Sequence, residues 1–486
     1  MSLMVSVAGI RGIVGKSLTP LVLTTYTQAY ATWLYKELHR QPKPNTVSRA
    51  EVPKVILGRD TRPTGKIISD FVQGVLVQAG CNVINLGVVT TPTVELAVTE
   101  EDADGGIIIT ASHNPVEWNA LKLLNALGEF LTPAQGTEVV ALAESKDFFS
   151  ATWNNFGMAI HKDDALDRHI EKVLNLPLIH PERIAARNYK VVIDAVNGAG
   201  SGVMPKLLEA LGAKEVIKVA CNGSGLFPHG PEPIEENLTE TMGITAYNGA
   251  DFGVVVDPDV DRIAFICEDG TLFGEEYTLV ACADYILKHR SGAVVNNLSS
   301  SRALEEIAAK YGAPFHTAKV GEANVVEVMK QVGAIIGGEG NGGVILPELH
   351  YGRDALVGLA LFMQAFADWQ TDNHDGKLSL FKKSFPEYHI AKHRIELSSG
   401  IDADTVLMRL QERYAAERMT TIDGVKIDFA ESWVHLRKSN TEPIIRIYAE
   451  AKTKTAAEKL ARDFGTELIE LAARSVSNVK VGDEIV

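Results

Sequence analysis

Residues 105–115 read Gly-Gly-Ile-Ile-Ile-Thr-Ala-Ser-His-Asn-Pro, an apolar run that passes directly into a polar loop. A short continuous apolar run between helical stretches is typical of a strand covered on both faces in an α/β layer. The loop after this predicted strand presents Ser112 with His113 beside it. A serine on a rigid loop serves as a nucleophile or a phosphate carrier, whereas an ordinary polar turn has no such role. The remaining motifs decide between these two interpretations.

Two further apolar runs end in comparable loops. Residues 252–256 (Phe-Gly-Val-Val-Val) lead into Asp-Pro-Asp-Val-Asp-Arg at 257–262, and residues 333–337 (Gly-Ala-Ile-Ile-Gly) lead into Gly-Glu-Gly-Asn-Gly-Gly at 338–343. Ligands of open α/β sheets bind at the carboxyl ends of the strands. Because the three units repeat a fold pattern, we expect three similar α/β domains with mixed sheets whose loops converge on one central cleft.

The end of the chain has a different pattern. Apolar residues at helical spacing mark one helix face near 406–414 and another near 460–471, and residues 433–436 and 444–449 alternate like antiparallel strands. This order predicts a smaller C-terminal α+β domain with helices on one face of a sheet. The expected domains are 1–160, 161–270, 271–385 and 386–486.

Composition limits the class of protein. The 486 residues are too many for one ordinary core, and 46% hydrophobic with 22% charged residues is a globular composition. A net charge of −15 disfavours nucleic acid and anionic membranes as partners. We find no apolar run of membrane-span length, no secretory signal and no Cys-x-x-Cys pair among the four cysteines. We therefore expect a cytoplasmic protein without a cysteine zinc site.

Asp257, Asp259 and Asp261 form the strongest candidate metal site. In an extended segment a spacing of two places all three carboxylates on one side. Such a cluster is unfavourable unless a cation neutralises it, and hard oxygen ligands suit Mg²⁺. A solvated acidic turn is the alternative. A magnesium ion beside Ser112 would neutralise charge on a phosphoryl group in transfer.

Three other segments carry charged or polar groups that suit a ligand. Lys122 follows Ser112 by ten residues, but a lysine acts as a base only where burial or nearby cations lower its pKa. Glu339 lies in a glycine-dense loop and can accept hydrogen bonds from two vicinal sugar hydroxyls. The loop 437–443 (Arg-Lys-Ser-Asn-Thr-Glu-Pro), followed by Arg446, combines guanidinium groups, hydroxyls and backbone amides that suit an anion. The alternatives are a surface lysine, a flexible glycine turn and a capped hairpin.

Taken together, these motifs resemble those of the α-D-phosphohexomutase family, in the same order and over essentially the whole chain. The segment 110–115 is similar to the family's phosphoserine loop and 257–262 to its metal loop. The segments 338–343, 437–443 and 8–12 are similar to its sugar loop (Gly-Glu-x-Ser-Gly), its phosphate loop (Arg-x-Ser-Asn-Thr-Glu-Pro) and its N-terminal Ser-Gly-Ile-Arg-Gly.

Four positions depart from the family's motifs. Ala8 replaces serine, Ala120 replaces the glycine of an Asn-Gly-x-Lys element, Asn341 replaces the serine of the sugar loop, and Gly343 replaces a frequent histidine. Glycine permits a positive φ that alanine disfavours, so Ala120 bears on the backbone geometry near Lys122.

The resemblance implies a role for each site residue. Ser112 would carry the phosphoryl group and, with Asp257, Asp259 and Asp261, bind Mg²⁺. Lys122 would be a candidate general acid or base, Arg11 would contact the transferring phosphate, and His113 would support the loop. The implied substrate-binding residues are Arg262, Lys319, Glu339, Asn341, Arg437, Ser439, Asn440, Thr441 and Arg446. Arg59 and Arg62 match an element expected to be structural, and His350, Arg353 and Asp354 could line the cleft.

The implied activity is the interconversion of hexose 1-phosphate and hexose 6-phosphate through a phosphoserine and a hexose 1,6-bisphosphate. The sugar loop is closer to phosphoglucosamine mutase-like members, with phosphomannomutase/phosphoglucomutase as the alternative. A metal-dependent sugar phosphatase and a non-enzymatic sugar-phosphate-binding regulator are the competing functions. The expected partners are the sugar phosphates alone, without nucleic acid or membrane, and the expected state is a monomer or homodimer.

Overall fold

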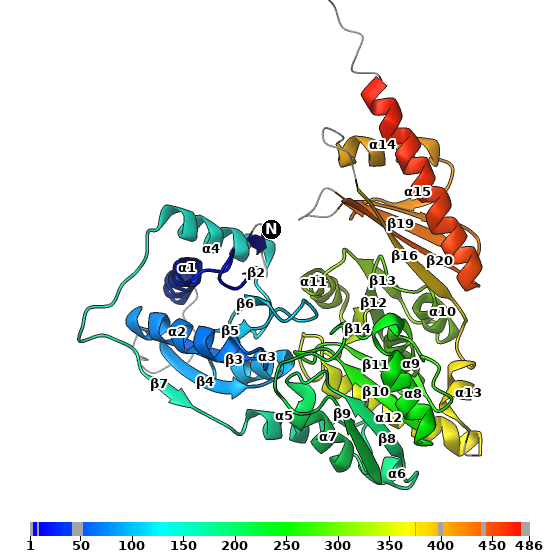
Figure 1. Ribbon diagram of the computed structural model, residues 1–486, viewed down its shortest axis with the longest axis horizontal. Helices are drawn as coiled ribbons and strands as arrows, with labels where there is room; N and C mark the ends of the chain where they lie inside the picture. The colour runs from blue at the N-terminus through cyan, green and yellow to red at the C-terminus, as the bar shows by residue number, and fades with distance from the viewer. Residues whose placement is uncertain are drawn as a thin grey trace, which may run out of the picture.

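The computed structural model describes residues 3–6, 9–40, 52–374, 376–396, 402–438 and 444–477. In this part of the chain the strands form four sheets, each with its own helices (Figure 1). Three sheets belong to α/β units with mixed strand directions and the fourth to an α+β unit, which confirms the predicted fold class. Across these ranges, no helix combines the length and apolar character that crossing a membrane requires.

The first domain is built on a seven-stranded sheet. From edge to edge its strands are β1 (Met4–Ser6), β2 (Gly9–Ile13), β6 (Trp118–Leu124), β5 (Gly105–Ile109), β3 (Lys54–Arg59), β4 (Asn82–Val88) and β7 (Ala159–His161). One face packs against α1 (Pro20–Arg40), α2 (Gly65–Gln78) and α4 (Pro133–Ser145), and the other against α3 (Thr91–Glu100). Strand β5 directs Ile107 and Ile109 to the first face and Ile108 to the second, so its predicted burial on both faces is confirmed.

The second and third domains are four-stranded units that share one hydrophobic core. The second has the strand order β11 (Ile263–Cys267), β10 (Phe252–Val256), β8 (Lys190–Asp194), β9 (Glu215–Val219), with helices α5 (Ala165–Leu174), α6 (Pro181–Ala185), α7 (Gly200–Ala210) and α8 (Thr239–Tyr247) and a short 3₁₀ turn, η1 (Glu235–Asn237). The third has the strand order β13 (Phe315–Ala318), β12 (Ala293–Asn297), β14 (Ala334–Glu339), β15 (Gly343–Ile345), with helices α9 (Glu275–His289), α10 (Ala303–Lys310), α11 (Glu322–Val332), α12 (Ala355–Asp372) and α13 (Leu378–Lys382).

Helix α12 joins these two domains. It packs against α5, α6 and β11 on one side and against α9 and β15 on the other, and its side chains are buried along most of its length. Phe362 of α12 stacks on Phe265 of β11, inside an aromatic cluster that includes Phe273 and Phe381. Burying this much aromatic surface holds the two domains as one packed unit. The loops after β10 and β14 are therefore fixed relative to each other.

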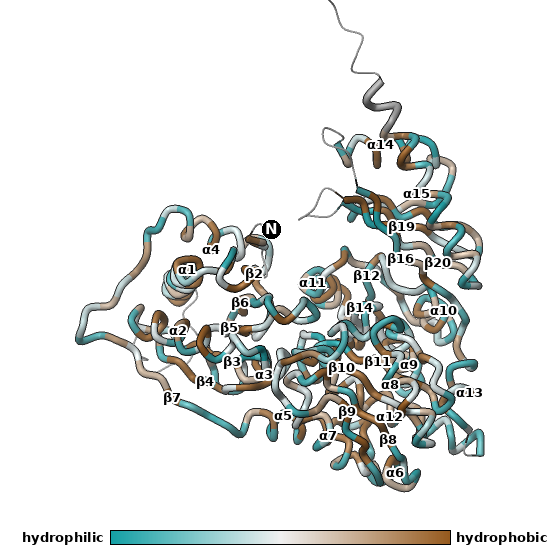
Figure 2. The backbone as a smooth tube through the Cα atoms, in the orientation of Figure 1, coloured by the Kyte–Doolittle hydropathy of each residue, from teal (hydrophilic) through white to brown (hydrophobic). Residues whose placement is uncertain are grey.

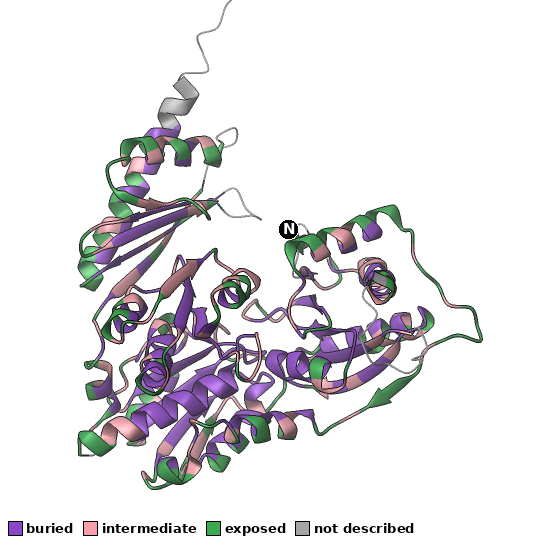
Figure 3. Ribbon diagram, turned by 180° about the vertical axis from the view of Figure 1, so that it is seen from behind, coloured by how far each residue is buried: buried purple, intermediate pink, exposed green. Residues whose placement is uncertain are grey.

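The fourth domain is an antiparallel sheet with helices on one face. The strand order is β16 (His389–Glu396), β20 (Ile444–Ala451), β19 (Trp433–Lys438), β18 (Val425–Asp428), β17 (Arg418–Thr420), and the helices are α14 (Ala403–Arg413) and α15 (Lys454–Ser477). Figure 2 shows hydrophobic residues concentrated on the strands, and Figure 3 shows the same strands buried while the outer faces of the helices are exposed. The predicted helix faces and alternating strands of this domain are confirmed.

A buried histidine connects the fourth domain to the third. The ring of His435 on β19 is fully buried; its Nε2 donates to the carbonyl of Asp423 at 2.6 Å, so its Nδ1 accepts from the hydroxyl of Ser299 at 2.9 Å. Burial lowers the pKa of His435 to about 4, and the charge of Lys426 adds to this effect. The contact between the domains therefore depends on a neutral imidazole.

We predict that acid loosens this contact. In the unfolded chain the histidine pKa is about 6.5, so between roughly pH 6.5 and 4 only the unfolded state binds the proton, and stability is lost as the pH falls. The loss at pH 5 relative to pH 7 is about 2 kcal/mol. Hydrogen exchange of the β19 amides, corrected for intrinsic rates, measures it. His435→Gln removes this pH dependence. An equally steep dependence in the variant would contradict the assignment.

Candidate active site

Ser112 lies in the loop between β5 and β6 with a backbone φ of 47°. A positive φ is uncommon for a residue other than glycine, and such residues concentrate at functional loops. Arg62 fixes the loop, because its guanidinium donates to the carbonyls of Ser112 (2.6 Å), Asn114 (2.7 Å) and Pro115 (2.6 Å). Asp60 in turn pairs with Arg62 at 3.0 Å. The structure thus presents the Ser112 hydroxyl on a rigid backbone.

The three aspartates converge in a tight turn after β10. The N–H of Val260 donates to the carbonyl of Asp257 at 3.1 Å, and the N–H groups of Asp261 and Arg262 donate to Oδ1 of Asp257 at 3.1 and 3.2 Å. The expectation of an extended segment was therefore wrong, since the turn rather than a spacing of two gathers the carboxylates. One oxygen from each of Asp257, Asp259 and Asp261 lies within 4.8 Å of the others.

The serine and the acidic triplet meet across two domains. The Ser112 hydroxyl donates to Oδ2 of Asp257 at 2.8 Å, and all three carboxylates are fully buried. Burial, and then the charges of Asp261 and Asp259, raise the pKa of Asp257 well above its usual range. Oδ1 of Asp259 and Oδ1 of Asp261 have no hydrogen-bond partner among the described residues. Hard oxygen donors, excess negative charge and these two buried oxygens fit a divalent cation.

Lys122 is a cation in direct contact with the triplet. It lies on β6, and its ammonium is 2.7 Å from Oδ2 of Asp259 and 3.6 Å from Oδ2 of Asp261. Burial would lower the pKa of Lys122, but these two carboxylates outweigh burial and raise it. The condition for a base, a lowered pKa, is therefore not met. Ala120 pairs regularly with Arg11 of β2 and has no positive φ, so this position does not need glycine.

Two further residues lie close to the serine loop. Arg11 on β2 donates to the side chain of Asn114 at 2.8 Å. His113 Nδ1 is 3.3 Å from the Ser112 hydroxyl. The positive charge of Arg262, followed by burial, lowers the pKa of His113 well below its usual range, so the imidazole is neutral.

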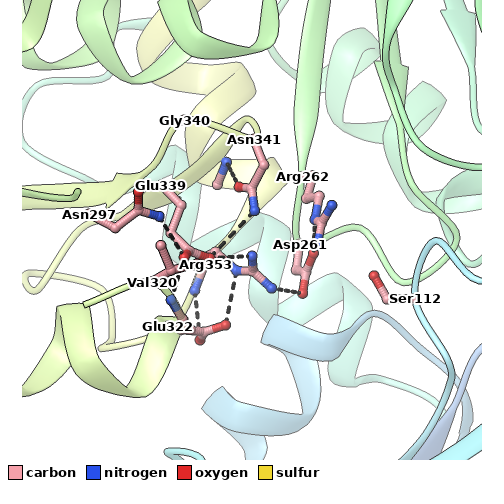
Figure 4. Close-up of polar contacts among 12 residues, drawn as sticks. Ser112, Asp261, Arg262, Asn297, Val320, Glu322, Glu339, Gly340, Asn341 and Arg353 are labelled. Atoms are coloured by element: carbon pink, nitrogen blue, oxygen red, sulfur yellow. Dashed lines mark hydrogen bonds and ion pairs between the residues drawn. The ribbon is translucent and has the colours of Figure 1, made fainter. Parts of the chain in front are cut away.

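Glu339 ends β14 and is the centre of the glycine-rich loop (Figure 4). Its Oε1 accepts from Asn297 at 2.8 Å and from the N–H of Gly321 at 2.9 Å, and its Oε2 accepts from Arg353 at 2.7 Å and from Asn341 at 3.4 Å. Burial would raise the pKa of Glu339, but the charge of Arg353, together with the N–H of Gly321, the charge of Arg262 and the amide of Asn297, outweighs burial and lowers it. Glu339 is therefore a carboxylate with a fixed orientation.

All four domains line one cleft of about 730 Å³. The predicted site residues on its wall are Arg11, Ser112, His113, Lys122, Arg262, Glu339, Asn341, Arg437 and Arg446. Asp257, Asp259 and Asp261 lie buried behind Ser112. Lys319 is exposed and does not belong to the wall. Ser439, Asn440 and Thr441 lie outside the described residues.

Sequence reasoning missed several contacts at this site. Thr91, at the start of α3, donates to Oδ2 of Asp259 at 2.6 Å, and Glu232 pairs with Arg262 at 3.1 Å. Asp354 caps α12 and accepts from His169, so of the triad suggested for the cleft only Arg353 reaches it. No sequence motif identifies Thr91 or Glu232 as a site residue. Arg353 was suggested by its position shortly after the glycine-rich loop.

Comparison with known proteins identifies the family. Models of the phosphoglucomutase/phosphomannomutase α/β/α domains I, II and III match residues 3–150, 167–270 and 274–386, and the model of the C-terminal domain matches residues 396–466. The chain belongs to the α-D-phosphohexomutase family, which confirms the resemblance. Its relatives are isomerases that transfer phosphate within a hexose phosphate.

Two relatives are similar over nearly their whole length. A phosphoglucomutase/phosphomannomutase from Thermococcus kodakarensis is 36% identical over 468 residues, covering 96% of this chain and 98% of the relative. A phosphoglucosamine/phosphogalactosamine mutase from Sulfurisphaera tokodaii is 31% identical over 463 residues, covering 94% and 96%.

Solved structures share the fold. A phosphoglucomutase/phosphomannomutase family protein from Burkholderia thailandensis has a TM-score of 0.78 at 23% identity, covering 96% of this chain and 98% of that one. The N-acetylphosphoglucosamine mutase of Aspergillus fumigatus, in complex with GlcNAc-6P and magnesium, has a TM-score of 0.58 at 14% identity, covering 96% and 95%.

We predict that the triplet binds one divalent cation. Asp259→Asn removes a charged ligand and weakens Mg²⁺ binding at least about 100-fold, because even residues outside the ligand set cost 10- to 100-fold in metal sites. Calorimetric titration with Mg²⁺ measures it. Asp269→Asn, which changes an aspartate of the β11 hairpin, is the control and leaves binding unchanged. Equal Mg²⁺ affinity in Asp259→Asn and the wild type would refute the site.

Proposed function

We propose that this protein is a phosphohexomutase that interconverts hexose 1-phosphate and hexose 6-phosphate and prefers amino sugars, as a phosphoglucosamine mutase does. One observation carries the mechanism: the Ser112 hydroxyl lies 2.8 Å from the buried carboxylate of Asp257, which belongs to another domain, in a cleft lined by all four domains. A phosphoryl group on Ser112 would lie beside the acidic triplet and face the cleft.

The first transfer uses Ser112 as the donor. A free hydroxyl of the bound hexose phosphate attacks the phosphorus of phosphorylated Ser112; the new O–P bond forms as the bond to the serine oxygen breaks. Despite burial, Asp259 and Asp261 raise the pKa of Lys122, so it is protonated at neutral pH and we assign it as the acid that gives its proton to the departing serine oxygen. The proton lost by the attacking hydroxyl restores the ammonium of Lys122, so the step balances. Mg²⁺, bound by Ser112 and the three aspartates, would neutralise charge on the moving group. Arg11 contacts that group through a guanidinium suited to phosphate.

The second transfer requires the bisphosphate to turn over within the cleft. Its other phosphate then returns to Ser112 and the isomer leaves. We assign the phosphate that is not in transfer to Arg437 and Arg446, together with Ser439, Asn440 and Thr441. Glu339 and Asn341 contact the ring hydroxyls in both orientations, with Arg262 nearby and Lys319 reaching substrate only if its loop closes. Closure of the fourth domain would exclude the water that hydrolyses a phosphoserine.

The remaining assignments follow from the same site. The resident ion is Mg²⁺, the partners are a hexose phosphate and its 1,6-bisphosphate, and the protein is a monomer or homodimer. The four functional units correspond to residues 1–160, 161–270, 271–385 and 386–486. Four free cysteines favour the reducing cytoplasm as the location.

We predict that activity depends on the Ser112 oxygen. Ser112→Ala lowers kcat/KM at least about 10⁴-fold, since loss of a covalent nucleophile costs that much in enzymes with a single one. A radiolabelled bisphosphate transfers label to the wild type and not to the variant. Ser145→Ala, at the exposed end of α4, is the control. Full activity in Ser112→Ala would exclude the phosphoserine.

We predict isomers, not inorganic phosphate, as products. Wild-type protein with Mg²⁺, a trace of hexose 1,6-bisphosphate and each of glucosamine, mannose and glucose 1-phosphate forms the 6-phosphate, fastest with glucosamine. Product analysis by ³¹P NMR checks this. Release of inorganic phosphate without an isomer would favour a phosphatase, and binding without turnover would favour a regulator.

A further inference from the structure

Arg353 joins the glycine-rich loop to the metal loop. It precedes α12, and its buried guanidinium contacts three carboxylates: Nε to Glu322 at 3.0 Å, Nη1 to Glu339 at 2.7 Å and Nη2 to Asp261 at 2.7 Å (Figure 4). Glu322 begins α11, Glu339 ends β14, and Asp261 follows β10. One planar group therefore determines the relative placement of three elements, two of which belong to the proposed active site.

The side chain of Arg353 has little freedom in this environment. The side chains of Arg353 and Asp261 are 9% and 0% exposed. Guanidinium nitrogens point in fixed directions, so the three contacts define one orientation. Removing the guanidinium would leave buried carboxylates without a counter-charge, which is strongly unfavourable. Without it Glu322 would keep the backbone N–H of residue 353 as a donor, and Glu339 would keep Asn297, the N–H of Gly321 and the long contact from Asn341, but neither would retain a charged hydrogen-bond partner among the described residues.

Gly343 makes room for this side chain. A Cβ atom at position 343 would lie 2.3 Å from Cδ and 2.9 Å from Cγ of Arg353. The aliphatic part of Arg353 thus runs through the space where any side chain at position 343 would begin. The histidine that is frequent at this position in the motif could not fit beside Arg353. The glycine and the arginine are therefore mutually dependent.

The four hydrogen bonds that Glu339 accepts differ in length, which indicates the donor that a sugar hydroxyl can replace. Each carboxylate oxygen accepts two donors, which fills the usual capacity of the group. A sugar hydroxyl can bind Glu339 only by replacing one of these donors. The contact from Asn341, at 3.4 Å, is the longest of the four. We expect Asn341 to give way while Arg353 holds the carboxylate in position.

We propose that Arg353 is a positioning residue that orients Glu339 toward the ring hydroxyls of the substrate and keeps the sugar-binding loop in register with the metal loop. This inference rests on the proposed function, because it assigns a role in recognising the sugar. It assigns that role to a residue outside the glycine-rich loop itself.

The test compares the wild type with Arg353→Met on a hexose phosphate and on its 2-, 3- and 4-deoxy analogues. A hydrogen bond to a charged group contributes about 10- to 100-fold, so the wild type loses that factor in kcat/KM on the analogue that lacks the hydroxyl bound by Glu339. In Arg353→Met, kcat/KM for the parent substrate falls by a similar factor. The ratio of kcat/KM between the parent and the deoxy analogue therefore falls to less than about threefold. Calorimetric binding in a Ser112→Ala background gives the same comparison without turnover.

A matched control isolates this role from general stability. Arg168 also contacts three carboxylates, those of Glu100, Glu101 and Asp164, but outside the cleft. Arg168→Met removes a three-carboxylate network that is more exposed, and it keeps the full discrimination between the parent and deoxy sugars. Arg353→Lys keeps the charge but cannot reach three carboxylates, so it recovers only part of the discrimination.

A second variant keeps the inference testable if Arg353→Met fails to fold. Gly343→Ala places a methyl group against the side chain of Arg353 and displaces that side chain. The positive charge is retained, but the preference for the parent sugar over the deoxy analogue is lost. The double variant Gly343→Ala/Arg353→Ala is no worse than Arg353→Ala alone, because the Cγ and Cδ atoms that the new methyl group would meet are gone. The inference is wrong if the wild type isomerises the hexose phosphate and prefers it to the deoxy analogue, and if Arg353→Met and Gly343→Ala both show the same preference as the wild type. If the wild type isomerises no hexose phosphate, the proposed function itself has failed.

Discussion

Three carboxylates buried within 4.8 Å of one another are stable only where cations neutralise them, and this constraint organises the molecule. The cations that the protein supplies come from different domains: Lys122 from the first, Arg262 from the second and Arg353 from the third. Arg262 belongs to the acidic turn itself, whereas Lys122 ties β6 of the first domain to that turn and Arg353 ties the segment before α12 of the third domain to it. The need to neutralise the triplet therefore holds the walls of the cleft together as well as preparing a metal site.

The domain arrangement serves this requirement in two different ways. The second and third domains share one core through α12, so the metal loop and the glycine-rich loop are set by hydrophobic packing. The fourth domain is connected by polar contacts such as that between His435 and Ser299. Polar contacts are easier to break than a shared core, which suits a domain that has to admit and release a sugar phosphate.

The sequence predicted the parts of the site that follow from strand ends. A buried strand with a polar loop at its carboxyl end is visible in residues 105–115 and 252–262, and Ser112 and Asp257 do meet. The fold class could be predicted for the same reason, because apolar runs and helix faces are local patterns. The turn at 257–262 could not be predicted, since it depends on hydrogen bonds to the side chain of Asp257.

Charge states and side-chain orientations that depend on neighbours from other domains could not be predicted from the sequence. The pKa of Lys122 is raised because two aspartates lie more than 130 positions away in the chain but adjacent in space. The role of Arg353 depends on three partners and on the empty space at Gly343. A motif gives the residue type at such positions, whereas its charge state and orientation come from tertiary packing.

The most direct test of the account is the spectrum of Mn²⁺ in place of Mg²⁺ on protein phosphorylated at Ser112. If the phosphoserine and the acidic triplet share one ion, electron–nuclear double resonance will show ³¹P coupling of the size expected for a phosphate oxygen bound directly to the metal. Dephosphorylation will remove this coupling. Stoichiometric Mn²⁺ on fully phosphorylated protein without any ³¹P coupling would contradict the central claim.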